Sequence, residues 1–181
     1  MRKLFALDKK DYDENSPLYI RPSVRGIVIQ NGRIAMVHSL KYDYYKFPGG
    51  GIEGEESQIE TLIREVKEEA GLIVKVESVQ EFGMVRRKQK SPLYGDTFVQ
   101  DNYYYLCEVE EGVEPQTLDD YEQEERFTLE FVEPKQAIEV NRDRDHGPKD
   151  QAMIEREARV LEMLIAEGWI YNYRYKIIDI K

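Results

Sequence analysis

Apolar residues recur along this chain in short runs that turn-forming residues separate. The runs at residues 24–30 and 33–40 flank the pair Asn31 and Gly32. Asn-Gly favours a type I′ turn, because both central residues of that turn need positive φ. The first half of the chain therefore predicts a β-hairpin.

Other segments have apolar residues at helical spacing. Residues 57–70 form the first, and Gly71 suits the C′ position that ends a helix. Residues 133–140 predict a short helix, and residues 153–167 predict a second long helix that stops at Gly168.

The remaining apolar runs fit strands, many of them aromatic, at residues 41–47, 72–88, 98–111, 126–132 and 169–179. The last of these places Trp169, Tyr171, Tyr173 and Tyr175 on one side of a strand. Its role stays open between an extra sheet strand, a dimer contact and part of a base pocket.

Two polar stretches lack such periodicity. Residues 1–22 are interrupted by Pro17 and Pro22, and residues 117–125 are acidic without apolar anchors. We expect irregular chain at the first and a loop at the second. Interspersed strands and helices with a clear hairpin predict an α/β fold, in which helices cover a mixed β-sheet as an α/β/α sandwich.

Composition narrows the functional classes. The chain has 181 residues, a formal net charge of −10 and one cysteine. The length suggests a single domain over residues 1–181, and the charge argues against long nucleic acid as the main partner. We find neither a signal pattern nor an apolar run near the length of a membrane span, so we expect a soluble, cytoplasmic protein. Cys107 is expected to be a small buried hydrophobe in a strand.

The first long helix carries an unusual charge pattern. Residues 49–72 contain seven glutamates and only two basic residues, Arg64 and Lys67. At about 100° per residue, Glu65, Glu68 and Glu69 share an arc that borders the apolar stripe rather than opposing it. A solvated acidic face is the simple interpretation of such a helix.

The segment before the helix favours a different interpretation. A Pro-Gly-Gly-Gly loop at residues 48–51 allows close approach of a ligand and presents bare carbonyl groups. Converging carboxylates and a backbone carbonyl form a hard oxygen site of the kind that Mg²⁺ or Mn²⁺ prefers.

The stretch resembles the Nudix box, G-x5-E-x7-R-E-U-x-E-E-x-G-U, where U is aliphatic. Gly50 is followed after five residues by Glu56, and after seven more by the run from Arg64 to Leu72, so every fixed position is filled. The resemblance implies a Nudix-type α/β/α sandwich with a common core at about residues 20–140. A helix and strand at about residues 145–181 would form a C-terminal extension.

The resemblance also implies an activity. Nudix enzymes hydrolyse a nucleoside diphosphate linked to another moiety, so we expect metal-dependent cleavage of a pyrophosphate bond in a small-molecule nucleoside diphosphate derivative. The cofactor would be Mg²⁺ or Mn²⁺. The alternative is a catalytically inactive module that binds nucleotides or regulates, although such proteins usually lose box glutamates.

Residue roles follow from the match to the motif. The expected metal ligands are Gly49 (through its carbonyl), Glu56, Glu65, Glu68 and Glu69. Glu56 would also support the helix start, Glu68 would take part in catalysis, and Arg64 would orient a glutamate by ion pairing. Glu60, in a Ser-Gln-Ile-Glu capping box, is assigned a structural role.

The general base and the substrate are less defined. The resemblance leaves the base open between a box glutamate and an acid of a loop distant in sequence. The acidic loop offers Glu122, Glu124 and Glu125, of which we take Glu125 as the expected base, while a solvated loop has at least equal weight for any one of them. The basic run at residues 86–90 suits either distal phosphates or a solvated strand edge. Aromatic residues before the box suit base stacking or, more often, core packing, and a homodimer is possible. These residues are Tyr42, Tyr44, Tyr45 and Phe47.

Overall fold

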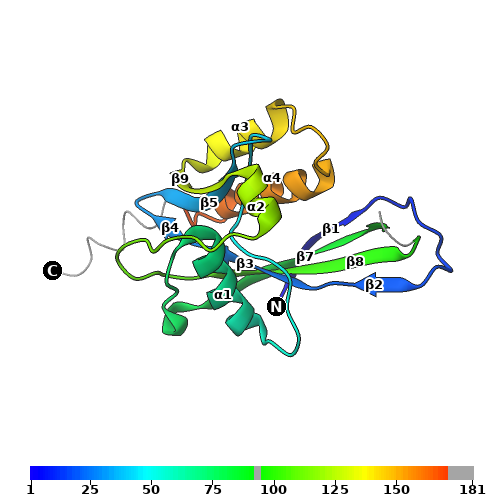
Figure 1. Cartoon of the computed structure of the whole chain (residues 1–181), viewed down its shortest axis with the longest axis horizontal. Coiled ribbons are helices and arrows are strands. Elements are labelled where there is room, and N and C mark those ends of the chain that lie inside the picture. The colour runs from blue at the N-terminus through cyan, green and yellow to red at the C-terminus, as the bar shows by residue number, and fades with distance from the viewer. Residues whose placement is uncertain (92–94, 171–181) are drawn as a thin grey trace.

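The structure is a computed structural model that describes residues 1–91 and 95–170. Its larger sheet is mixed and five-stranded, with β1 (Lys3–Asp8), β7 (Gln80–Lys90), β8 (Thr97–Leu106), β2 (Leu18–Ile20) and β3 (Ser23–Ile27). Strand β8 runs antiparallel to β7 and parallel to both β2 and β3, and β1 runs parallel to β7. In Figure 1, β1, β2, β7 and β8 extend to the right of the helices as an arm.

The smaller sheet is antiparallel and contains β4 (Ile29–Gln30), β5 (Arg33–Ser39), β6 (Tyr44–Lys46) and β9 (Phe127–Val132), with β5 paired to the other three. The predicted hairpin is confirmed at β4 and β5, where Asn31 and Gly32 have φ of 52° and 76°. The first arm of the hairpin is split, because β3 joins the larger sheet and β4 the smaller one. One apolar run therefore connects the two sheets.

Helices cover both faces of this framework. They are α1 (Gln58–Ala70), α2 (Asp120–Glu125), α3 (Pro134–Asp143) and α4 (Gln151–Ala166), with a 3₁₀ turn at Val76–Ser78. Figure 1 places α1 on one side of the strands and α3 with α4 on the other. The strands contribute to two separate cores, since Val24 and Ala35 pack with the α1 stripe while Ile34 and Met36 pack with α4. The α/β/α arrangement is thus confirmed.

The ends of α1 are set by local sequence, as expected. Ser57 is the N-cap and forms a reciprocal capping box with Glu60, and Gly71 ends the helix in the left-handed conformation at φ 66°. Such an N-cap stabilises a helix by about 1 kcal/mol. Leu62, Val66 and Ala70 on the apolar stripe are fully buried. The adjacent edge of α1, which carries the glutamate cluster, is therefore held at a fixed orientation.

Two sequence expectations were wrong. Residues 1–22 contain β1 and β2, whose side chains are mostly exposed; backbone pairing to β7 and β8 holds them, so no apolar alternation marks them. Residues 117–125 end in the short helix α2 rather than a loop, because Asp119 and Glu122 form a capping box. This helix buries glutamates in place of apolar anchors, which hides it from a periodicity search.

The C-terminal helix is part of the core. Val160, Leu161 and Leu164 of α4 are fully buried against the strands. Trp169 lies in a turn after α4, and the expected positions of Tyr171, Tyr173 and Tyr175 lie outside the described residues. Within the described part of the chain, no helix combines the length and apolar character needed to cross a membrane.

Candidate active site

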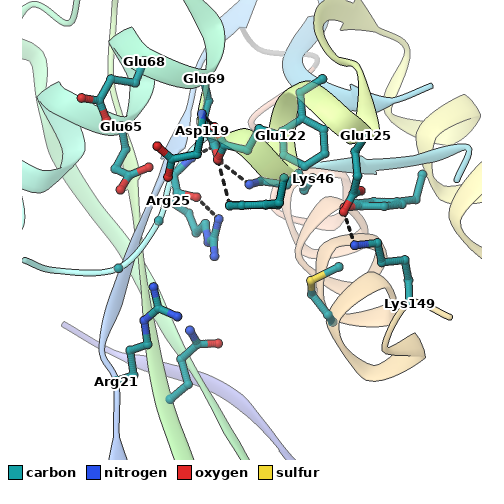
Figure 2. Close-up of a pocket in the computed structure, with 18 of the residues that line it drawn as sticks. Arg21, Arg25, Lys46, Glu65, Glu68, Glu69, Asp119, Glu122, Glu125 and Lys149 are labelled. Atoms are coloured by element: carbon teal, nitrogen blue, oxygen red, sulfur yellow. Dashed lines mark hydrogen bonds and ion pairs between the residues drawn. The ribbon is translucent and has the colours of Figure 1, made fainter. Parts of the chain in front are cut away.

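A cleft of about 590 Å³ opens beside α1, α2 and the first residues of α4 (Figure 2). Its acidic side chains include Glu65, Glu68, Glu69, Asp119, Glu122 and Glu125, and its basic ones include Arg21, Arg25, Lys46, Lys149 and Arg156. Carboxylates from α1 and α2, which are about 50 residues apart in sequence, therefore meet in one place together with several cations.

The glycine loop brings backbone close to the acidic helix. At Gly49, φ is 146° and a Cβ atom would lie 2.1 Å from the carbonyl oxygen of Val24, so only glycine fits. The Gly49 N–H donates to Oε2 of Glu69 at 2.8 Å, and the Gly49 carbonyl accepts a hydrogen bond from Nη1 of Arg25. The backbone N–H and C=O of Gly49 thus both contact charged residues that line the cleft.

Glu69 is the most buried carboxylate of the cluster, at 1% exposure. Besides Gly49, it is bonded by the ammonium group of Lys46 from β6. Burial raises the pKa of Glu69 to about 7, because the attraction of Lys46 and Arg25 offsets the lost hydration only in part and the nearby charge of Glu122 opposes ionisation. The site therefore holds a carboxyl group whose negative charge is incompletely neutralised.

Arg64 forms hydrogen bonds with the other two glutamates of the cluster, Glu65 and Glu68. Its Nη1 donates to Glu65 at 2.8 Å and to Glu68 at 3.0 Å, and its Nη2 donates to the Gly51 carbonyl at 3.2 Å. Glu65 is mostly buried, and burial raises its pKa although Arg64 opposes the shift. Glu68 is about two-fifths exposed and forms the outer member of the set.

Glu56 takes a different place from the other box glutamates. It receives Nε and Nη2 of Arg64 at 2.8 and 2.9 Å and the hydroxyl of Thr61 at 2.9 Å. The hydrogen bonds from Arg64 hold the pKa of Glu56 down at about 2. Glu56 is absent from the lining of the cleft, so its contact with the glutamate cluster runs through Arg64.

Two of the three candidate bases, Glu122 and Glu125, extend from helix α2 into the cleft. Glu122 is buried and receives the Tyr121 hydroxyl at 2.8 Å and the Asp119 N–H at 2.9 Å. Burial alone would raise the pKa of Glu122, but a hydrogen bond with Glu69 and these donors hold it below its usual range. Glu124 instead points outward and pairs with Lys41.

Glu125 lies one helical turn further on and is 3% exposed. It accepts hydrogen bonds from the Ser39 and Tyr44 hydroxyl groups at 3.0 and 2.9 Å, and its other oxygen pairs with Lys149. These contacts fix its carboxylate at the wall of the cleft, as Figure 2 shows for the pair with Lys149.

The donor set suits a hard divalent cation. Carboxylate and carbonyl oxygens are the ligands that Mg²⁺ and Mn²⁺ prefer. Burial raises the pKa values of Glu65 and Glu69, and further positive charge nearby would offset this cost of ionisation. Across residues 1–91 and 95–170, however, no three acidic, histidine or cysteine side chains already form a metal-binding group. Lys46, Arg25 and Arg64 bond the donors instead, so metal binding requires the side chains to exchange these partners.

Sequence reasoning missed the cations of the site. Arg25 and Lys46 lie within β3 and β6 and are almost fully buried, and Arg156 on α4 is 1% exposed. A single charged residue inside an apolar strand run, as in Val-Arg-Gly-Ile and Tyr-Lys-Phe, was the available signal for the first two. No comparable signal marks Arg156, whose position depends on how α4 docks.

The residues before the box divide between core and cleft. Tyr45 and Phe47 are buried in the main core, as core packing predicts, whereas Tyr44 lines the cleft and donates to Glu125. Cys107 is buried directly after β8, and burial raises the pKa of its thiol to about 12. This agrees with the expected role of a small hydrophobe.

Comparison with known proteins places the chain in a family. A family model described as NUDIX domain matches residues 20–155. Among solved structures, a NUDIX hydrolase from Nitrosomonas europaea aligns with a TM-score of 0.59 at 16% identity, covering 82% of this chain and 90% of that one. A MutT NUDIX hydrolase from Burkholderia pseudomallei aligns with a TM-score of 0.51 at 17% identity, covering 80% and 97%. At this identity the structural likeness concerns the fold.

Curated relatives match over shorter segments. An RNA pyrophosphohydrolase of Halorhodospira halophila is 43% identical over 54 residues, which is 29% of each chain. An ADP-ribose pyrophosphatase of Methanocaldococcus jannaschii is 36% identical over 67 residues, which is 34% of this chain and 40% of that protein. The chain thus spans less than half the length of these relatives.

Proposed function

The chain belongs to the NUDIX family, and from that premise we propose that it hydrolyses the pyrophosphate bond of a nucleoside diphosphate linked to another moiety. The observation that carries this proposal is the position of Glu65, Glu68 and Glu69 along one wall of a cleft that also presents buried cations. A pyrophosphate ester is polyanionic, so positively charged groups that line the cleft favour its binding. The names of the curated relatives, a pyrophosphohydrolase and a pyrophosphatase, support the same reaction class.

We propose Mg²⁺ or Mn²⁺ as the cofactor, held by the carboxylates of Glu65, Glu68 and Glu69 and by the carbonyl of Gly49. The chemistry that such an ion supplies is polarisation of phosphoryl oxygens and neutralisation of charge. We also expected Glu56 to be a ligand and to support the site. Its bonds to Arg64 favour the supporting role, in which Glu56 holds Arg64 in place.

The residues of the chain have separate tasks in this proposal. Arg64 orients Glu65 and Glu68 through one guanidinium nitrogen. Glu125, fixed at the cleft wall by Tyr44 and Lys149, accepts the proton of the attacking water. Glu122 is the alternative base, but its position near Glu69 favours a role beside the metal ligands.

A substrate panel tests the proposal. Purified protein with Mg²⁺ or Mn²⁺ is incubated with nucleoside diphosphate sugars, dinucleotides and nucleoside triphosphates, and products are identified by chromatography. Glu68→Gln and Glu69→Gln should each lower kcat by roughly 100-fold or more, with unchanged far-UV circular dichroism. Glu55→Gln, an exposed change in the same stretch, is the matched control.

Two results would contradict the proposal. Absence of turnover over the whole panel, combined with tight nucleotide binding, would identify a binding module instead of an enzyme. Turnover that survives both glutamate substitutions would remove the assigned roles of Glu68 and Glu69 while leaving the family membership intact.

A further inference from the structure

A second pocket of about 350 Å³ adjoins the catalytic cleft on the side of β7 and β8. It shares Arg21, Arg25, Gln100 and Arg156 with the cleft, so the same side chains line both spaces. Its further lining includes Arg87, Tyr19 and Phe98. We call this space the arginine pocket.

The pocket carries more positive than negative charge. Its basic residues are Arg21, Arg25, Arg87 and Arg156. Two carboxylates pair with this group: Asp150 binds Arg87 at 2.6 Å, and Glu157 binds Arg156. Asp150 also receives Lys9 at 2.9 Å, so it is shared between two cations. The excess of cations is an electrostatic arrangement that favours an anion.

Two of these arginines are nearly buried and incompletely hydrogen-bonded. Arg25 and Arg87 are 8% and 7% exposed, and the Nε atom of each has no hydrogen-bond partner within the part of the chain that the structure describes. Buried donors of this kind are uncommon, because leaving one unpaired costs about 1–3 kcal/mol. Burial, with the nearby charges of Arg156 and Arg25, lowers the pKa of Arg87 to about 10 even though Asp150 opposes the shift.

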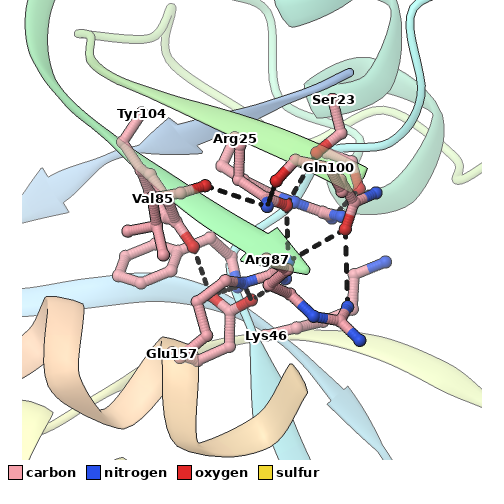
Figure 3. A network of polar contacts seen from close by, with 12 residues as sticks. Ser23, Arg25, Lys46, Val85, Arg87, Gln100, Tyr104 and Glu157 are labelled. Atoms are coloured by element: carbon pink, nitrogen blue, oxygen red, sulfur yellow. Dashed lines mark hydrogen bonds and ion pairs between the residues drawn. The ribbon is translucent and has the colours of Figure 1, made fainter. Parts of the chain in front are cut away.

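Hydrogen bonds hold Arg87 and Arg156 in place. Gln100 accepts weakly from Arg87 at 3.4 Å and from Arg156 at 3.5 Å. Figure 3 shows Arg25, Arg87 and Gln100 gathered at the end of the polar network that continues to Glu157. Arg156 is anchored further by Asn102. Guanidinium groups that are held in this way, those of Arg87 and Arg156, lose little conformational freedom on binding a ligand.

Aromatic side chains form another part of the pocket. The rings of Tyr19 and Phe98 lie 5.8 Å apart, and the guanidinium carbon of Arg87 lies 6.0 Å from the centre of the Phe98 ring. Tyr19 is 41% exposed. Such a surface suits the flat, partly apolar face of a nucleoside, next to arginines that suit its phosphate.

We propose that the arginine pocket binds a phosphate monoester that the substrate carries on its nucleoside, in addition to the pyrophosphate that is cleaved. The inference rests on the proposed function and narrows it to phosphorylated nucleoside diphosphate derivatives. A phosphate fits because guanidinium groups bind its oxygens in pairs. Because the same arginines line the pocket and the cleft, one substrate can contact both.

The neighbouring strand residue provides a matched control. Arg86 lies next to Arg87 on β7 but faces the other way, where Nε and Nη2 pair with Asp101 at 2.7 Å each. It contributes to neither the cleft nor the arginine pocket. Arg86→Gln therefore removes the same charge from the same strand without changing the proposed site.

Paired substrates test the proposal by kinetics. We compare ADP-ribose with 2′-phospho-ADP-ribose, and dephospho-coenzyme A with coenzyme A, which differ within each pair by one phosphate monoester. The wild-type protein with Mg²⁺ should show a kcat/KM about tenfold or more higher for the phosphorylated member of at least one pair. Arg21→Gln and Arg87→Gln should bring this ratio close to one, whereas Arg86→Gln should leave it unchanged. Arg21 is exposed, so its variant tests the site even if Arg87→Gln fails to fold.

A binding measurement separates this inference from the proposed function. Calorimetry with Mg²⁺ compares AMP with adenosine 2′,5′-bisphosphate and adenosine 3′,5′-bisphosphate, none of which contains a pyrophosphate. Tighter binding of a bisphosphate that Arg21→Gln removes would support the pocket even if no substrate is hydrolysed. Equal affinity for all three compounds, or a preference that Arg21→Gln and Arg87→Gln retain as fully as Arg86→Gln does, would overturn it.

Discussion

The carboxylate of Glu65 occupies the space that the side chain of any residue other than glycine would need at position 50. A Cβ atom built on Gly50 would lie 2.4 Å from Oε1 of Glu65, well inside van der Waals contact. The backbone of the glycine loop is thus in direct contact with the side chain of Glu65 on α1. This contact gives a physical reason for a glycine at the first position of the box.

Substitution of Gly50 tests that relationship. In Gly50→Ala the methyl group displaces the Glu65 carboxylate, which sits at the end of a flexible side chain. We expect the fold to persist and Mn²⁺ affinity to fall by roughly 10- to 100-fold, measured by calorimetry. Gly51→Ala is the control, because the nearest atoms to its Cβ atom belong to the end of the Arg21 side chain, at 3.1 Å. Equal metal affinity in both variants would contradict the role of the contact.

The raised pKa of Glu69 predicts a pH dependence of metal binding. With a pKa of about 7 against an ordinary 4.5, Glu69 holds a proton that a divalent ion has to displace below pH 7. Mn²⁺ affinity should therefore fall by about tenfold per pH unit between pH 7 and pH 5 and level off above pH 8. Calorimetry at five pH values measures this, and a flat profile would refute it.

The same shift affects the metal-free protein in the opposite sense. Between pH 4.5 and about 7, folded Glu69 keeps its proton while the unfolded chain has lost it, so the free energy of unfolding should decrease as pH rises through this window. Glu56, with a pKa near 2, stays ionised throughout. Urea unfolding of the wild type and Glu69→Gln in the presence of a chelator isolates the contribution of Glu69.

Arg64 should act as a positioning residue together with Glu56. Lysine cannot reproduce the forked contacts of Arg64 with Glu56 and with Glu65. Arg64→Lys should lower Mn²⁺ affinity by about 10- to 100-fold, and Glu56→Gln should produce a similar loss. If both act through the same link, the double variant is no worse than either single one; additive losses would indicate independent roles. Lys67→Gln, on the exposed side of α1, is the control.

Glu122 and Glu125 should be separable by their effects on rate and on metal affinity. If Glu125 is the base, Glu125→Gln lowers kcat by roughly 10²- to 10⁴-fold and leaves Mn²⁺ affinity unchanged. Glu122→Gln, next to Glu69, should weaken Mn²⁺ binding as well. Two results together would identify Glu122 as the base instead. The kcat of Glu125→Gln would be normal, and the pH–rate profile of Glu122→Gln would lose its acid limb.

Several features were predictable because their causes are local in sequence. The turn at Asn31 and Gly32 depends on the backbone preferences of two adjacent residues. The capping box of Ser57 and Glu60 and the stop at Gly71 depend on neighbours within one helical turn. The spacing of Glu65, Glu68 and Glu69 likewise follows from the geometry of the helix that carries them.

Other features depend on contacts between residues that are far apart in sequence, so only the structure reveals them. Strand β1 forms only because β7, about 80 residues later, supplies its backbone partners. Helix α2 buries Glu122 and Glu125 because the cleft, rather than an apolar core, lies beneath it. A periodic pattern of apolar residues reveals which positions face an apolar core. It does not reveal polar residues that are buried at a functional site.

The sequence by itself determined a carboxylate cluster on the edge of a core-facing helix, since helical spacing and the glycine loop are written in consecutive residues. Only the tertiary structure decided which charges meet that cluster. Lys46 of β6 reaches Glu69 on α1, and Arg25 of β3 reaches the Gly49 carbonyl. Arg87 and Arg156 converge from β7 and α4. Electrostatic partners act through space, and distance in space is set by how the sheets and helices pack.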